Sequence, residues 1–122
     1  KFLSLLRGMF SGDVVLEPRH ASWFEEQSDS LLKEFHIARV AADPGCVPAS
    51  SRPGGLGSLV YFRLHGSPRR YFSAYSGEYL NILAAQLASL VAGARAWCIF
   101  DNTASGSAVQ NAFELAAKLR KL

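Results

Sequence analysis

Cysteine is scarce in this sequence, with two residues in a chain of 122. One pair of cysteines cannot build the disulfide framework of a small secreted domain. Cys46 and Cys98 also lack the Cys-x-x-Cys spacing of a redox or zinc motif. Unpaired thiols are typical of proteins kept in a reducing compartment. The cysteine content therefore predicts a cytoplasmic protein.

Long apolar runs are also missing, although 49% of the residues are hydrophobic. No stretch reaches the roughly 18 apolar residues of a membrane span, so we expect no membrane partner. Residues 1–10 have apolar side chains at helical spacing, but Arg7 interrupts them and no small-residue cleavage site follows, which argues against a signal peptide. The formal net charge of +3 allows an anionic partner without requiring one.

The common catalytic motifs are absent as well. The sequence has no His-x-His or HExxH metal spacing and no GxSxG nucleophile motif. Gly54, Gly55 and Gly57 are not followed by a helical pattern, so they do not form a phosphate-binding loop. Any function must therefore be inferred from where polar residues lie in the fold.

Short apolar segments alternate with helical patterns along the chain. The segments that predict buried strands are 13–17, 37–42, 59–64 and 96–100. Apolar residues at helical spacing in 1–10 predict the end of a helix. The same spacing predicts helices over 23–35, 76–91 and 106–122, with Ser22 and Ser76 as N-caps. Most of the strand segments are continuously apolar, as in parallel strands covered on both faces. This order predicts an α/β fold with about four parallel strands alternating with helices.

Residues 43–58 interrupt this alternation. They are rich in Pro, Gly and Ser and show no helical signal, so we expect a surface loop there. No internal repeat, second domain or low-complexity tail is present.

Polar side chains follow each predicted strand at the point where it ends. In chain order these are Glu17, Arg19 and His20, then Asp43, then Arg63 and His65, then Asp101 and Asn102. The carboxyl ends of parallel strands form the functional face of α/β proteins, because the loops that follow them gather there. The sequence therefore predicts a site at this edge of the sheet.

The chemistry of these residues favours an anionic ligand. Acid/base groups are predicted as the catalytic set, namely Glu17, His20, Asp43 and His65. The same residue types can hold a divalent metal, but their spacing gives that cofactor only weak support. Two guanidinium groups, Arg19 and Arg63, repel a metal and attract phosphate or carboxylate. With Asn102 as a further donor, we predict that these three bind the substrate.

Basic and aromatic residues after the third strand allow a second interpretation. Arg69 and Arg70 lie beside Tyr71 and close to Tyr75, and such residues can grip a nucleic-acid backbone and stack a base. Tyr71 and Tyr75 are therefore predicted to bind ligand, in an enzyme or in a non-catalytic module for nucleic acid or another anion. In a third interpretation, the strand-end residues are a structural ion-pair network in a scaffold protein.

Several of these segments resemble the YecE-like family, domain of unknown function 72. They are 17–24, 61–66, Tyr71, Tyr75–Ser76, 100–102, Ala108 and Asn111–Ala112. Their order and spacing agree with the family's pattern from about residue 3 to residue 119, although Ala21 stands where the family has Pro. The resemblance implies a TIM-type (β/α)8 barrel. It marks Glu17, Arg19, His20, Asp43, Arg63, His65 and Asn102 as signature polar residues, and it supplies no reaction.

The resemblance covers only the C-terminal half of such a barrel, since a whole one needs about 250 residues and eight strands. We therefore expect residues 1–122 to be a single partial domain holding strands 5 to 8, with the N-terminal half absent. The start at Lys1, inside a helical pattern, agrees with this expectation. Such a chain either needs the missing half or associates with a second copy of itself.

Overall fold

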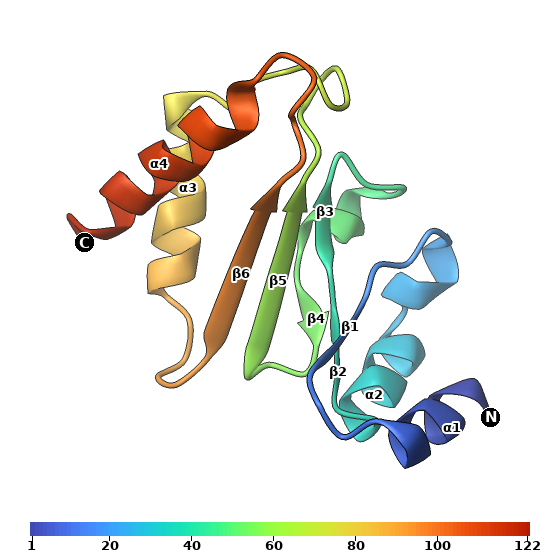
Figure 1. Ribbon diagram of the computed structural model, residues 1–122. Helices are drawn as coiled ribbons and strands as arrows, with labels where there is room; N and C mark the ends of the chain where they lie inside the picture. The colour runs from blue at the N-terminus through green and yellow to red at the C-terminus, as the bar shows by residue number, and fades with distance from the viewer.

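Parallel strands form the centre of the computed structural model, which describes residues 1–122 (Figure 1). The strands of this surface are β1 (Val14–Leu16), β2 (Ile37–Arg39), β3 (Ala41–Asp43), β5 (Leu59–Leu64) and β6 (Arg95–Phe100). The pairs β1–β2, β3–β5 and β5–β6 are all parallel. The predicted mixed α/β fold with parallel strands is confirmed.

β2 and β3 belong to one extended segment that is interrupted at Val40. Val40 still donates its N–H to the carbonyl of Leu16, at 2.9 Å, so the pairing with the β1 side continues across the interruption. The two three-stranded sheets, β1-β2-β4 and β3-β5-β6, therefore join through this segment. Four extended segments thus lie side by side in the order in which they occur in the chain.

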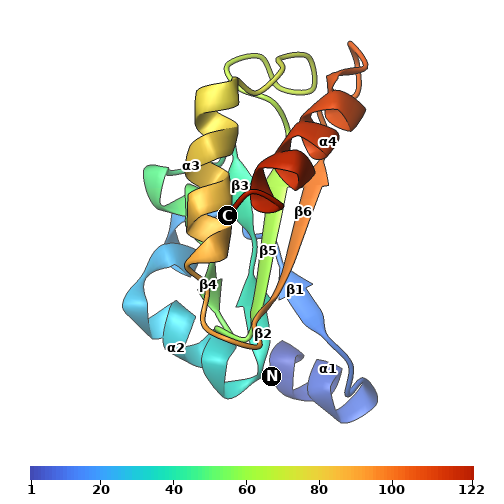
Figure 2. The ribbon, with the colours of Figure 1, turned by 90° about the vertical axis from the view of Figure 1, so that its left-hand side faces the viewer.

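Helices cover one side of these strands. They are α1 (Phe2–Met9), α2 (Glu26–Glu34), α3 (Gly77–Ala88) and α4 (Ser107–Leu119). Leu3, Leu32 and Ile37 form a small core under α1 and α2, and a larger one lies under α3 and α4. Figure 2 shows α3 and α4 packed on the same side of β5 and β6. None of the helices is long and apolar enough to cross a membrane.

The other side of the strands is concave and largely uncovered. Phe62 and Leu64 of β5 point into the core, so Tyr61 and Arg63 between them point to the opposite face. Trp97 of β6, which is paired with Tyr61, is 55% exposed. Within residues 1–122 the strands are therefore covered on one face, because the four helices all pack on the same side.

The second predicted helix begins later than its apolar pattern indicates. Residues Ala21–Phe24 form a short 3-10 helix, η1, and α2 begins only at Glu26. Ser22 is therefore not the N-cap of α2; that position is Glu25, whose backbone is extended and whose side chain makes no capping bond. The helical backbone is interrupted at Glu25, whose extended conformation ends η1 and precedes the first residue of α2.

The loop over 43–58 contains regular structure that its composition did not predict. Pro48–Ser51 form a 3-10 turn, η2, and Gly54–Gly55 form β4, which pairs antiparallel with β2. Gly55 has a φ of +66°, and a Cβ there would lie 2.3 Å from the carbonyl oxygen of Ile37. Only glycine fits this left-handed backbone so close to a neighbouring strand.

Ser76 begins α3 as predicted, and its hydroxyl accepts a hydrogen bond from the Tyr79 N–H at 3.2 Å. We expect Ser76→Ala to lower the free energy of unfolding by about 1 kcal/mol, because the first turn loses its side-chain acceptor. Urea denaturation measures this change. Ser4→Ala, at an exposed position inside α1, is the matched control and should leave stability nearly unchanged. An equal loss in both variants would contradict the capping role.

Candidate functional site

Four ionisable side chains meet at the carboxyl ends of the strands. Arg63 donates from Nη1 to Glu17 Oε2 at 2.7 Å and from Nη2 to Asp101 Oδ2. His65 Nε2 lies 3.4 Å from Glu17 Oε1, and His65 Nδ1 lies 3.2 Å from Asp101 Oδ2. We call Glu17, Arg63, His65 and Asp101 the ionic cluster.

Strand alternation explains why these residues share one face. Glu17 directly follows β1, whose Val14 and Leu16 pack against the small core, so Glu17 points to the concave side. Arg63 and His65 are two residues apart at the end of β5, and Asp101 directly follows β6. The Glu17–Arg63 pair therefore crosses over β3, which lies between β1 and β5.

Charge balance sets the ionisation of the cluster. Burial opposes the ionisation of Glu17, but the hydrogen bond and charge of Arg63, with smaller contributions from His65 and Arg19, hold its pKa below the ordinary value of 4.5. Burial also opposes the charge on Arg63, yet bonds to Glu17 and Asp101 raise its pKa. Both groups stay charged at neutral pH. The two amino groups of Arg63 are engaged by two carboxylates.

A cavity of about 150 Å³ opens next to the cluster, between the ends of β1 and β3. Glu17, Arg19 and Arg70 supply its charged lining, and Pro44 and Gly45 supply backbone. Arg19 Nη2 lies 3.1 Å from Glu17 Oε1, and its side chain is largely exposed. Arg70 donates to the carbonyl of Pro44 at 2.7 Å. The cavity therefore has two cationic side chains, with Glu17 and Ser50 as its other polar side chains.

Tyr71 lies against His65 from the loop that follows β5. The two rings meet edge to face, with centroids 5.8 Å apart, and Tyr71 is 47% exposed. Its φ of 69° is unusual for a residue other than glycine. Backbone strain of this kind is found most often at binding and catalytic sites. The structure thus brings predicted site residue Tyr71 to the cluster.

Asn102 and Tyr75 lie in a buried hydrogen-bond network beneath the site. Asn102 is fully buried, and its Nδ2 donates to the carbonyl of Ser73 and to Asn111 Oδ1, at 3.0 and 2.9 Å. The Tyr75 hydroxyl donates to the carbonyl of Asp43 and accepts from Gly66 N–H. The Asn102 Nδ2 group and the Tyr75 hydroxyl both bind the protein itself, which favours a role in holding the loop, whereas the buried Asn102 Oδ1 has no hydrogen-bond partner.

Asp43 lies on the opposite side of the strands from the cluster. It pairs with Leu64, whose side chain is in the core, and its buried Oδ2 has no hydrogen-bond partner. Burial, with a further contribution from the Asp43 charge, raises the pKa of both Tyr75 and Tyr79. Of the predicted catalytic residues, the structure does not bring Asp43 to Glu17 and His65.

His20 also lies apart from the cluster. Its Nδ1 accepts from the N–H of Ser22 at 3.3 Å, which caps the 3-10 helix η1, and the ring is exposed. No group of three or more His, Cys, Asp or Glu residues is arranged to hold a metal ion. Burial raises the pKa of the Cys98 thiol to about 11, and Cys46 and Cys98 are both unpaired.

The sequence places Asp101 at a strand end and Arg70 in the loop after the third strand, but the predicted catalytic and substrate-binding set includes neither of them. Asp101 contacts Arg63 and His65, and Arg70 lines the cavity. Asp101 directly follows a strand, as Glu17 does, so its position at a strand end already indicates a site residue. Nothing in the sequence brings Arg70 to Pro44, because that contact depends on how two loops fold together.

The fold and site together define a mixed α/β protein with an ionic cluster at the carboxyl ends of parallel strands. More narrowly, the chain belongs to the family described as "Protein of unknown function DUF72", which matches residues 1–122. No curated protein matches the sequence.

Two solved structures of this family resemble the chain. A DUF72 family protein of Thermotoga maritima MSB8 is 28% identical, with a TM-score of 0.84; the match covers 98% of this chain and 50% of that one. A DUF72 family protein of Enterococcus faecalis V583 is 21% identical, with a TM-score of 0.76, and the match covers 98% and 52%. The chain therefore spans about half the length of these structures, and the second match shows the fold alone.

The lowered pKa of Glu17 makes its contribution to stability depend on pH. Because the pKa is lower in the folded state, the stabilisation is present above 4.5 and is lost as the pH falls through the folded value. We expect Glu17→Gln to be less stable than the parent at neutral pH and to approach it in acid. Urea denaturation at both pH values tests this expectation.

The control for this experiment is Glu34→Gln, at an exposed position in α2 that has no ion-pair partner. It should change stability equally at both pH values. A Glu17→Gln deficit that stays constant from neutral to acid pH would show that the carboxylate charge does not stabilise the fold.

Proposed function

We propose that residues 1–122 form the C-terminal half of a YecE-like (β/α)8 barrel, holding its strands 5 to 8. The order of the strands supports this proposal, since four parallel segments follow one another in the sheet as they do in the chain. Helices on one side and a concave opposite face are the arrangement of a barrel wall. The match to half of each solved structure also supports a partial domain.

We further propose that this barrel is an enzyme acting on an anionic substrate, of the phosphorylated or phosphodiester class. One observation carries the proposal: a histidine–carboxylate pair and an arginine-lined cavity lie next to each other at the carboxyl ends of the strands. Active sites of barrel enzymes are built at this end. Arginine recognises phosphate through parallel hydrogen bonds.

In this proposal, His65 and Glu17 exchange protons with the substrate. His65 Nε2 makes a hydrogen bond with Glu17 Oε1 at 3.4 Å, so a proton can pass between these two groups. Arg63 holds Glu17 and Asp101 in place. Both amino groups of Arg63 are bonded to carboxylates, whereas Arg19 and Arg70 each have one amino group bonded and line the cavity. We therefore assign binding of the anion chiefly to Arg19 and Arg70. Roles for His20, Asp43 and Asn102 in the reaction stay predictions.

A cytoplasmic location is part of the same proposal. It is supported by the two unpaired cysteines, one of which is exposed.

Removing either cavity arginine should weaken anion binding. We expect Arg19→Ala and Arg70→Ala each to lower the affinity for inorganic phosphate about tenfold, because each removes a charge-assisted hydrogen bond worth roughly 1.5–3 kcal/mol. Chemical-shift titration of the chain measures the affinity. The matched control is Arg52→Ala, which removes an exposed arginine outside the cavity and should bind phosphate as the parent does. Phosphate affinity that is unchanged in both cavity variants would exclude this assignment.

A non-catalytic nucleic-acid module is the second candidate function. It is favoured by exposed aromatics beside arginines in the loop after β5: Phe72 is 43% exposed and lies 3.9 Å beneath the Arg69 guanidinium. This function predicts that a single-stranded oligonucleotide binds, that added salt weakens the binding steeply, and that Tyr71→Ala and Phe72→Ala reduce it. Electrophoretic mobility or fluorescence anisotropy at two salt concentrations measures this. An oligonucleotide affinity that is the same at both salt concentrations would exclude the nucleic-acid function.

A further inference from the structure

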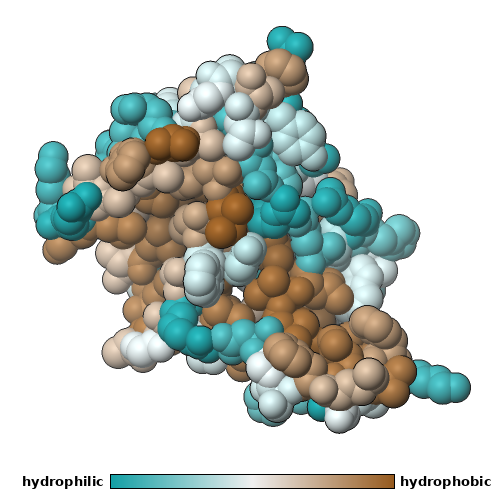
Figure 3. Space-filling model, viewed as in Figure 1, coloured by the Kyte–Doolittle hydropathy of each residue, from teal (hydrophilic) through white to brown (hydrophobic).

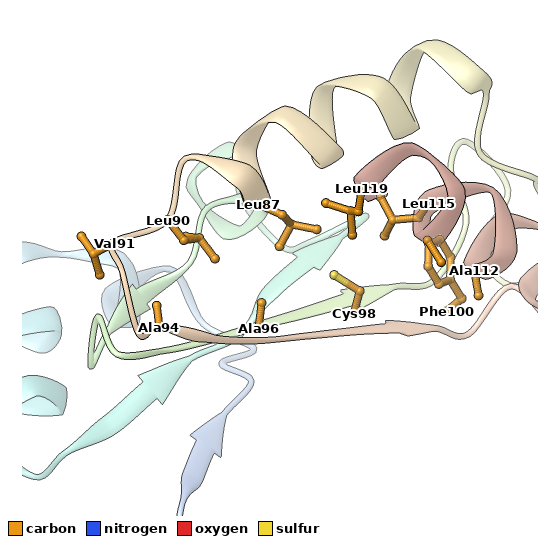
Figure 4. A pocket seen from close by; sticks show the side chains of 11 residues that line it. Leu87, Leu90, Val91, Ala94, Ala96, Cys98, Phe100, Ala112, Leu115 and Leu119 are labelled. Carbon is orange, nitrogen blue, oxygen red and sulfur yellow. The ribbon is translucent and has the colours of Figure 1, made fainter. Parts of the chain in front are cut away.

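Apolar surface is open around β6. An apolar groove of about 450 Å³ lies between α3, α4 and β6, and Leu87, Cys98 and Leu119 point into it (Figure 4). Figure 3 shows brown apolar atoms in the middle of the molecule, between groups of teal hydrophilic atoms. In the proposed half-barrel, the edge strand β6 adjoins the half that lies outside residues 1–122, so this open surface does not mark a separate site.

A buried ion pair on the helix side of the strands is, by contrast, surrounded by elements of this chain. Arg39, the last residue of β2, is 8% exposed and points to the same side as Ile37, which lies in the small core. Its Nη2 lies 3.7 Å from Oδ1 of Asp29 on α2, and the same oxygen accepts the Gly55 N–H at 2.7 Å. A Cβ on Gly54 would collide with both charged groups, so β4 packs directly on the pair.

The Arg39 guanidinium also holds the 3-10 helix η1. Its Nη1 donates to the carbonyl of Trp23 at 3.1 Å, and its central carbon lies 4.7 Å from the centroid of the Phe24 ring. A cation over an aromatic ring is attracted to it. Ser28 of α2 adds a hydrogen bond to the carbonyl of Ser22, at 2.8 Å. Two consecutive residues of η1 therefore contact one side chain of β2.

η1 forms part of the wall of the anion cavity. Phe24 lines the cavity together with Glu17 and Arg19. Residues 17–20 connect the end of β1 to η1, so the position of η1 sets the path of the backbone that carries Arg19. The loop that contains β4 supplies more of the lining, namely Pro44, Gly45, Cys46 and Ser50. The Arg39–Asp29 pair thus contacts both segments that build the cavity.

Stability alone is a weak reason for this buried pair. Apolar side chains of similar volume often stabilise a protein as much as a buried ion pair does. Arg39 Nε is also buried without a hydrogen-bond partner, which adds a cost. A guanidinium, however, has several donors in one plane, so it can bind a carboxylate and a carbonyl at the same time. An apolar side chain cannot hold the Trp23 carbonyl in this way.

We infer that Arg39 is a positioning residue of the anion site, which holds η1, and with it Phe24 and the backbone of Arg19, in the geometry that binds a phosphoryl group. Arg39 does not itself line the cavity, so it acts through these neighbours. This inference rests on the proposed anion-binding function and names the residue that fixes its geometry.

Arg39→Met tests the inference, because it keeps a long side chain beside Phe24 and removes the donor to Trp23. We expect it to lower the affinity for inorganic phosphate about tenfold, the effect of losing one charge-assisted hydrogen bond from Arg19. Chemical-shift titration of the protein measures the affinity. The matched control is Lys33→Met, which removes the exposed cation paired with the same carboxylate and should bind phosphate as the parent does.

A double variant separates positioning from stability. Asp29→Asn combined with Arg39→Met removes both buried charges and keeps an amide oxygen as the acceptor for Gly55 N–H. We expect this variant to fold, by circular dichroism, with a melting temperature near that of the parent, and to bind phosphate as weakly as Arg39→Met. Recovery of both stability and phosphate affinity in the double variant, or loss of folding in both variants, would show that the pair is only structural.

The exposed thiol of Cys46 gives a second readout, because it lines the same cavity as Arg19 and Arg70. Its thiolate attacks an aromatic disulfide and releases an aromatic thiolate. The ratio of its rates with an anionic and a neutral aromatic disulfide, followed at Cys46 by mass spectrometry, reports the positive potential of the cavity. Arg39→Met should shift this ratio toward that of Arg19→Ala, whereas Lys33→Met should keep the parent ratio.

An unchanged rate ratio in both Arg39→Met and the double variant would overturn the inference, as would an unchanged affinity in a parent that binds phosphate. A parent that binds no phosphate would instead contradict the proposed function. The rate ratio still tests the role of Arg39 in that case, because it needs no bound phosphate.

Discussion

One guanidinium group connects three strands of this protein. Arg63 lies on β5 and bonds Glu17 at the end of β1 and Asp101 at the end of β6. The contact with Glu17 spans β3, so it ties together two strands that are not neighbours in the sheet. Removing Arg63 would leave the partly buried carboxylates of Glu17 and Asp101 without the cation they share, which is more costly than losing an exposed ion pair. The relative position of the three strand ends and the geometry of the candidate site therefore depend on the same interaction.

A second network, behind the strands, places the loop that completes the site. Asn111 of α4 binds both backbone groups of Tyr75, and the Tyr75 hydroxyl bridges the end of β3 and the start of the loop at Gly66. With its ends fixed in this way, the loop brings Arg70 to the cavity and Tyr71 to His65. The left-handed backbone at Tyr71 is held by bonds from the neighbouring loop, since the Tyr71 carbonyl accepts from Ala104 N–H.

Elements with strong local signals were predicted well. The strand segment 59–64 and the Ser76 cap agree with the structure, because an apolar run and a capping hydroxyl act over a few residues. The start of α2 and the structure within 43–58 were missed, since Glu25 breaks the helix through its backbone and Gly54–Gly55 pair with a strand distant in sequence. Local sequence preferences do not predict pairing with a segment that is distant in the chain.

The sequence by itself determined which segments become parallel strands and that polar residues follow each of them. It also determined the family, through the spacing of short motifs along nearly the whole chain. Only the tertiary structure decided which strand-end residues meet. Side chains alternate across a strand, so a shift of one residue moves Asp43 to the core side while Glu17 and Arg63 share the concave face. The same three-dimensional arrangement buried Asn102 in a network and left Trp97 exposed, because burial depends on what covers each face rather than on the residue type.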